Sequence, residues 1–267
     1  MARIKGSEAI IVLMVNCKTY PAVSKKYTET VCTGGVQPNG EFVRLYPVPF
    51  RFLDTKEQYG RWDVIRVQVY RDTNDDRRES WHLEPGTLIE CIDKITTDRQ
   101  KWEWMKPTVH HSTEAMNAQD ITNGCVQIEP IELYYKDDPK EWTDSQKEAI
   151  AQGDLFATKE QMASLADRVP WQFRLKYREA NSGREGDCKV LAWSYYQGLR
   201  RRMQTDPVEV ALEFVSDRIK SSIFRPDRTL FGIFGTHRLS GHWMISSLYY
   251  VPTDIIVEEA QKAKALF

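Results

Sequence analysis

Residues 11–51 contain apolar and β-branched segments separated by turn signals, and this stretch limits the first part of the chain to a curled β-sheet. Its first five residues, Ile11–Val15, are all apolar. They are enough for a buried strand and far short of the roughly 20 residues that a membrane-spanning helix needs. The segments that follow are a β-branched strand, a glycine bend, a hairpin turn and a return strand, at residues 30–33, 34–35, 38–40 and 42–48.

A basic, aromatic loop joins the first two of these strands. It contains three lysines, two tyrosines and a serine, at Lys18, Tyr20, Ser24, Lys25, Lys26 and Tyr27. Lysine ammonium groups suit phosphate oxygens, and tyrosine rings are platforms on which bases stack. The loop is therefore a candidate nucleic-acid site. The alternative is a solvated surface loop whose tyrosines pack back onto the sheet.

The composition divides the chain into three parts. Short strands at roughly ten-residue spacing continue to residue 135, which is typical of a small barrel or sandwich. The next part is acidic and helical, and we expect a helical bridge there. The last part returns to β structure, with an alternating strand from Trp171, two helices and a closing hairpin. The predicted fold class is β-rich α+β, in the parts 1–135, 136–168 and 169–267.

Composition favours a soluble protein of a reducing compartment. The five cysteines are an odd number without CxxC spacing, which argues against a disulfide framework and a zinc finger. Because neither a signal-peptide pattern nor a membrane-length apolar run is present, we expect a cytoplasmic protein with no membrane partner.

The charge of the chain is unevenly distributed. The net charge is −1, yet residues 1–51 carry seven basic against three acidic residues, and residues 171–225 carry eleven against seven. The segments between them are acidic. The two basic segments are either one positive face or two ordinary solvated surfaces.

Short motifs follow one another through the first half of the chain. They are Asn16-Cys17-Lys18, Ser24-Lys25-Lys26, Val31-Cys32-Thr33-Gly34, and a turn and strand from Gly40 to Pro47 that includes Arg44. In this order they resemble the dual OB-containing domains, a family of prokaryotic proteins. The resemblance implies an OB-like barrel and a nucleic-acid role in which Arg44 takes part. It also implies membership of an assembly such as those encoded in bacterial anti-phage defence operons.

The candidate phosphate contacts of the second half are three consecutive arginines, Arg200, Arg201 and Arg202. Successive residues of a helix point about 100° apart, so the three cannot all face one groove. One or two can reach phosphate while another pairs with an acid. A solvated helix end that complements the helix dipole is an equally good interpretation.

A second arginine cluster lies in the first half, in the loop that follows residue 70. Arg71, Arg77 and Arg78 are interspersed with four acidic residues of the same loop. Local salt bridges explain this cluster more simply than a bound ligand does.

Catalytic signals are weak. The triplet Asp187-Cys188-Lys189, with Glu179 upstream, has the acid-x-Lys form that Mg²⁺-dependent nucleases place on a strand beside another acid. Such triplets are common by chance, and the upstream Pro-Asp is missing. His237 and His242 flank the last turn, but without HxH or HExxH spacing. We therefore expect no catalytic residue, no metal and no cofactor.

The sequence predicts a protein that binds nucleic acid, DNA or RNA, without catalysing a reaction. In this interpretation it is a recognition subunit that works with other protein subunits. Two alternatives stay open. One is the Mg²⁺-dependent nuclease, and the other is a scaffold whose Tyr, Trp and Arg surfaces bind a partner chain.

Overall fold

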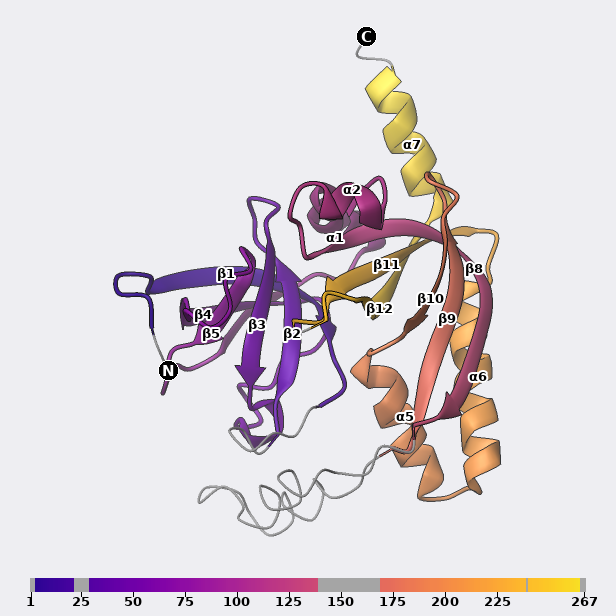
Figure 1. The fold of residues 1–267 in the computed structure, drawn as a ribbon, viewed down its shortest axis with the longest axis horizontal. Coiled ribbons are helices and arrows are strands. Elements are labelled where there is room, and N and C mark those ends of the chain that lie inside the picture. The colour runs from indigo at the N-terminus through magenta and orange to yellow at the C-terminus, as the bar shows by residue number, and fades with distance from the viewer. Residues whose placement is uncertain (1–2, 22–28, 139–168, 239, 265–267) are drawn as a thin grey trace. The chain divides into compact units, whose positions relative to one another are not determined.

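The computed structural model describes residues 3–21, 29–138, 169–238 and 240–264, and the chain divides into two compact units (Figure 1). The first unit contains Met1–Lys94 and Lys136–Gln172, and the second contains Ile95–Tyr135 and Phe173–Phe267. This division differs from the predicted parts 1–135, 136–168 and 169–267. Nearly all of the expected helical bridge, residues 139–168, lies outside the described residues.

The sheet of the first unit is made of β1 (Ala9–Lys18), β2 (Val31–Val36), β3 (Phe42–Val48), β4 (Asp63–Tyr70), β5 (Ser80–Leu83) and β6 (Glu90–Lys94). Since β1 pairs with both β2 and β4, five strands close into a barrel in the order β1-β2-β3-β5-β4. β3 and β5 run parallel, and β6 extends along β4. This is the arrangement of an OB-like barrel, as the resemblance implied.

Two glycines allow close packing inside this barrel. The sequence predicts a bend at Gly34 and Gly35, but both lie within β2. A Cβ on Gly35 would lie 2.7 Å from the Met14 carbonyl oxygen, and one on Gly34 would lie 2.5 Å from Cys17 Sγ. The bend was therefore the wrong interpretation. The glycines are needed because neighbouring atoms of β1 fill the space that a side chain would take.

The sheet of the second unit is made of β7 (Val109–His110), β8 (Asn123–Asp137), β9 (Trp171–Glu179), β10 (Glu185–Lys189), β11 (Arg228–Thr236) and β12 (Trp243–Pro252). The long strands follow the order β10-β9-β8-β11-β12, and β7 pairs with β8. The sequence predicts that the strand at 125–135 closes the first barrel. That prediction is wrong, because β8 pairs with β11, while β1 and β4 close the first barrel between themselves.

The second sheet also curls round on itself. Val190, directly after β10, forms a parallel bridge with Ile245 of β12, and the Leu191 amide donates to the Ile245 carbonyl oxygen at 2.8 Å. Five strands therefore adjoin in the order β8-β9-β10-β12-β11. Counted along the chain from β8, they are the first, second, third, fifth and fourth strands. The fourth, β11, pairs back to the first. This order, with a parallel contact between the third and fifth strands, is the order of the first barrel.

The helices are η1 (Phe50–Phe52) in the first unit and, in the second, α1 (Asp98–Met105), η2 (Lys106–Thr108), α2 (Thr113–Asn117), α5 (Trp193–Met203), α6 (Val208–Ile223) and α7 (Thr253–Lys264). Thr97 starts α1 with a capping box to Gln100. α5 and α6 are the two helices expected in the last part of the chain (Figure 1). Within the described residues, none of the helices combines the length and hydropathy that a membrane crossing requires.

Candidate nucleic-acid interface

The strand order of the first barrel singles out two loops. OB-like barrels bind oligonucleotides and oligosaccharides on the β2–β3 face and with the β1–β2 and β4–β5 loops. In this chain the β1–β2 loop covers residues 19–30, and the β4–β5 loop covers residues 71–79. The first of these contains five of the ten residues that the sequence predicts to bind nucleic acid, which are Tyr20, Ser24, Lys25, Lys26 and Tyr27.

Lys18, at the end of β1, turns its ammonium group towards the barrel. Its Nζ donates to the Tyr59 carbonyl oxygen at 2.6 Å and lies 3.6 Å from the centroid of the Phe50 ring. Burial lowers the pKa of this ammonium from 10.5 to about 8, although the nearby Asp63 carboxylate acts in the opposite direction. These contacts hold Lys18 as a packing residue beneath η1, and they do not direct its charge to a ligand.

The rest of the predicted β1–β2 site is only partly described. The Tyr20 hydroxyl accepts a hydrogen bond from the Val169 amide at 3.1 Å, so this tyrosine ties two chain segments of the first unit together. The other four predicted residues lie outside the described residues, and they are Ser24, Lys25, Lys26 and Tyr27. Their proposed role rests on their chemistry and on their position in the loop.

Arg44 is a buried residue of β3. Only 5% of it is exposed, its Nη2 lies 3.3 Å from Glu79 Oε1, and its amide donates to the Glu79 carbonyl oxygen at 2.8 Å. A guanidinium in this position stabilises the start of β5 and is not accessible to a phosphate. This pairing cannot be predicted from local sequence, because Glu79 lies in a loop far along the chain from Arg44.

The β4–β5 loop neutralises most of its own charge, as the sequence predicts. The Arg77 guanidinium pairs with Asp75 at 2.6 Å. Arg71 lies 3.8 Å from the centroid of the Trp81 ring and donates to the Arg77 and Ser80 carbonyl oxygens, and burial lowers its pKa. Arg78 differs, since 91% of its side chain is exposed and its nearest acid, Glu41, is 4.0 Å away. Arg78 is thus the exposed cation of this loop.

The three consecutive arginines of α5 point in different directions, as helix geometry requires. Arg202 pairs with Asp206 at 2.5 Å and lies over the Phe214 ring, 4.4 Å from its centroid. Arg200 is half-buried and Arg201 is exposed. Of the three, Arg201 is the one presented to solvent.

Ion pairs cover the outer side of β9. Three cations alternate along this strand, and each one meets an acid of a neighbouring strand. Arg174 pairs with Asp187 at 2.9 Å, Lys176 with Glu132 at 2.7 Å, and Arg178 with Glu185 at 2.7 Å. Because every cation already has a carboxylate, this face has no surplus positive charge for a phosphate backbone.

The residues of the nuclease hypothesis lie on opposite sides of the second sheet. The Asp187 carboxylate is half-exposed and accepts from Arg174 and from the Tyr134 hydroxyl. The Glu179 carboxylate is buried and accepts from the Thr113 and Ser182 hydroxyls at 2.5 and 2.6 Å. Two acids placed in this way cannot share one Mg²⁺. Among the described residues, no three His, Cys, Asp or Glu side chains are grouped so that they could hold a metal ion.

His237 and His242 face each other across the β11–β12 turn, as their spacing predicts. The His237 amide donates to the His242 carbonyl oxygen at 2.9 Å, and His237 Nδ1 lies 3.1 Å from Ser240 Oγ. Both residues are exposed.

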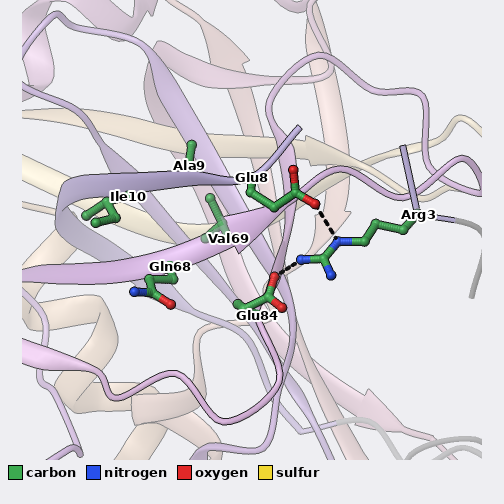
Figure 2. Close-up of a pocket in the computed structure, with 7 residues that line it drawn as sticks. All are labelled: Arg3, Glu8, Ala9, Ile10, Gln68, Val69 and Glu84. Atoms are coloured by element: carbon green, nitrogen blue, oxygen red, sulfur yellow. Dashed lines mark hydrogen bonds and ion pairs between the residues drawn. The ribbon is translucent and has the colours of Figure 1, made fainter. Parts of the chain in front are cut away.

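A hollow of about 510 Å³ lies beside the start of β1 and the end of β4 in the first unit (Figure 2). The Arg3 guanidinium reaches both acids of this hollow, Glu8 at 3.2 Å and Glu84 (Figure 2). Ile10 lines it and is 65% exposed. With one arginine between two carboxylates, the hollow has no excess positive charge and does not resemble a phosphate site.

Two family models match the chain. One, described as Domain of unknown function (DUF8758), covers residues 9–111, and the other, described as Domain of unknown function (DUF8757), covers residues 105–267. The first range contains β1 to β6, and the second contains β7 to β12. A comparison with curated proteins gave no match. Any function must therefore be inferred from the residues of the chain itself.

Proposed function

Since the chain belongs through residues 105–267 to the family described as Domain of unknown function (DUF8757), which brings no activity with it, we propose from its own residues that it binds nucleic acid and catalyses no reaction. One observation carries this proposal. The first barrel has the OB-like strand order, and in such barrels the β1–β2 and β4–β5 loops meet the ligand. By sequence, Lys25, Lys26 and Tyr27 belong to the first of these loops, and the exposed Arg78 belongs to the second.

The loops, and not the strand face, supply the proposed contacts. Arg44 is buried against Glu79, so it offers no charge on the surface of β3. Lysines in a loop can follow the phosphates of an irregular strand, while a tyrosine ring stacks on any base. We therefore expect binding with little sequence preference and a strong dependence on salt.

The test is a salt titration of affinity with Lys25→Glu combined with Lys26→Glu in the full chain. If both lysines contact phosphate, the slope of log K against log salt should fall by about 1.4 for a single strand, since each contact contributes about 0.7. A matched control is Lys5→Glu combined with Lys56→Glu, which makes the same charge change at two exposed lysines of the same unit. Equal slopes for the two double variants would remove the β1–β2 loop from the site.

We place the protein in a prokaryotic assembly, as a recognition subunit with other protein subunits, and an anti-phage defence system is the proposed setting. This part of the proposal rests on the resemblance of the first half to dual OB-containing domains. Affinity purification of the tagged chain from its native host, with and without nuclease treatment, tests it. Partners that remain after nuclease treatment support direct protein contacts, and partners lost with the nucleic acid contradict them.

The nuclease alternative is disfavoured by the placement of its acids on opposite sides of the sheet. It predicts Mg²⁺-dependent cleavage that disappears in Asp187→Ala. Our proposal predicts that any cleavage in a preparation is the same for Asp187→Ala and for the wild-type protein. Loss of cleavage in that variant alone would establish the nuclease.

A protein-interaction scaffold is the second candidate, and the outer side of α6 favours it. Val210 and Phe214 are 46% and 45% exposed and lie one helical turn apart, and the Arg202 guanidinium stacks on Phe214. Aromatic residues and arginine are enriched at protein interfaces. Binding of this kind buries apolar surface and depends weakly on salt, whereas phosphate binding weakens steeply as salt rises. The same titration therefore separates the two functions.

A further inference from the structure

The second unit contains a counterpart of the β4–β5 loop. Its strands adjoin in the same order as those of the first barrel, with β11 and β12 in the fourth and fifth places. The turn between β11 and β12 therefore corresponds to the loop at residues 71–79 of the first barrel. By the rule that applies to OB-like barrels, this turn is in a position to meet a ligand.

The two loops use their cations differently. Most of the positive charge of the loop at 71–79 is neutralised by acids of the same loop, as in the ion pair of Arg77 with Asp75. The β11–β12 turn contains no acid in its sequence. It presents His237, Arg238 and His242, all three exposed. Among the described residues, Arg238 makes no ion pair, so its guanidinium is open to an anion.

Backbone hydrogen bonds are formed on either side of residue 239, which lies outside the described residues. The Gly241 amide donates to the His237 carbonyl oxygen at 2.8 Å, and Gly241 has a φ of +67°, in the left-handed region that favours glycine. The His237 amide closes the turn onto the His242 carbonyl oxygen at 2.9 Å. Half-buried Trp243 follows directly and begins β12. The Trp243 ring packs edge-on against Phe234, with 6.3 Å between the ring centroids, so the group that this hairpin offers to a phosphate is the exposed Arg238.

The sheet face of the second unit cannot take this role. Counted from β8, the second and third strands of the second sheet are β9 and β10, and the β9 cations are paired with Glu132, Asp187 and Glu185. A phosphate backbone would have to displace these carboxylates. The β11–β12 turn has no such competitor in its own sequence.

We propose that the β11–β12 turn is a second nucleic-acid contact, in which Arg238 binds a phosphate of a single-stranded ligand. This inference rests on the proposed function. It gives the chain two contact sites, the β1–β2 loop of the first barrel and this turn of the second. A single strand is the expected ligand because OB-like modules that bind nucleic acid without sequence preference bind single strands.

The experiment measures binding of the full chain to a labelled oligonucleotide of about 30 nucleotides, longer than the roughly 4 to 16 that one OB-like module covers. Arg238→Glu should weaken binding about tenfold, the worth of one charge-assisted hydrogen bond. It should also reduce the salt slope by about 0.7. Arg238→Lys keeps the charge and should keep the slope. The control is Lys220→Glu, which reverses an exposed charge on α6 and should leave the slope unchanged.

Each outcome bears on a separate statement. If Arg238→Glu binds like the wild-type protein or like Lys220→Glu, the turn is not a contact, while the proposed function stands on the Lys25 and Lys26 result. If the wild-type protein binds only a duplex of the same length, the assignment of a single-stranded ligand is wrong. If the wild-type protein binds neither, both the proposed function and this inference fail.

Discussion

Val190 forms a parallel bridge with Ile245, and in the first barrel Leu45 of β3 pairs in parallel with Trp81 of β5. In both units, therefore, the third strand meets the fifth in parallel. The units differ in what connects the third strand to the fourth. The short η1 segment occupies this place in the first barrel, and α5 and α6 occupy it in the second. The chain thus repeats one strand order with two different insertions.

The pH dependence of stability should report the burial of Lys18. Its pKa is lowered from 10.5 to about 8 in the folded protein, so the folded state gives up this proton before the unfolded chain does. Below both values the cost of burying the charge is present in full. Between them the unfolded chain binds more protons, and the free energy of unfolding therefore rises with pH.

Lys18→Met isolates this contribution. The free energy of unfolding should be measured by urea unfolding for the wild-type protein and for Lys18→Met, from about pH 7 upwards. Over this range the wild-type protein should gain on the order of 1–2 kcal/mol of stability relative to Lys18→Met. Burial raises the pKa of Tyr59 and Cys32, which opposes the trend, but both residues are present in the two proteins. Their contributions therefore cancel in the difference. A difference that stays constant with pH would contradict the burial of the ammonium group.

Two glycine substitutions should change stability in opposite directions. A Cβ at Gly35 would lie 2.5 Å from Leu13 Cδ1 and 2.7 Å from the Met14 carbonyl oxygen. Because the backbone cannot move aside cheaply, Gly35→Ala should cost about 1–3 kcal/mol. A Cβ at Gly198, inside α5, would meet only Val215 Cγ2, at 3.9 Å. Gly198→Ala should therefore gain about 0.5–1 kcal/mol of helix stability. Thermal unfolding of both variants checks the prediction. A change in unfolding temperature of the same sign in the two variants would refute it.

Local patterns predicted the elements of this fold better than the partners of those elements. The alternation that begins at Trp171 correctly places Phe173, Leu175 and Tyr177 on the buried side of β9. An apolar pattern such as that of β8 indicates a buried strand but not the strand it pairs with, so the sequence alone predicts the wrong sheet for β8.

The candidate site was harder to predict for the same reason. The sequence predicts that Arg44 can contact a ligand, because its partner, Glu79, lies in a distant loop. Arg238 belongs to no sequence motif of its own, and the neighbouring His237 and His242 lack metal-ligand spacing. Its interest depends on the strand order, which places the turn at a ligand-binding position, and strand order is a tertiary property.

Removing one member of the buried pair of Arg44 and Glu79 should lower the free energy of unfolding strongly. Replacing both members by apolar residues should lower it much less. Their side chains are 6% and 11% exposed. Arg44→Met leaves the Glu79 carboxylate without the guanidinium that faces it, which should cost about 3–5 kcal/mol. Arg44→Met combined with Glu79→Leu should recover most of that loss, because both charges are then absent.

A surface pair provides the comparison. Arg66 and Glu90 are 51% and 56% exposed and lie 3.2 Å apart. Arg66→Met should cost less than about 1 kcal/mol. Urea unfolding of the wild-type protein and the three variants checks the prediction. A double variant no more stable than Arg44→Met would mean that packing by the Arg44 stem, and not its charge, matters at this position.

Fragments of the chain should test the assignment of β8 to the second sheet. The first 94 residues contain all six strands of the first sheet, and the pairing of β1 with β4 closes five of them into the barrel. A fragment 1–94 should therefore unfold cooperatively and remain monomeric. A fragment 1–135 adds most of β8 but lacks β9 and β11, its neighbours in the sheet. Cys125 and Val126, fully buried in the whole chain, would then lie on an unpaired strand.

Unpaired strands with apolar side chains template association between chains. Fragment 1–135 should therefore elute as larger species in size-exclusion chromatography, and it should bind a hydrophobic dye more strongly than fragment 1–94 does. The matched control is fragment 1–135 with Val126→Lys and Ile128→Lys, which places charge on the same strand and should restore the monomer. A monomeric fragment 1–135 beside an unfolded fragment 1–94 would mean that the first barrel needs residues beyond β6, and that its five-stranded closure is not enough to hold it together.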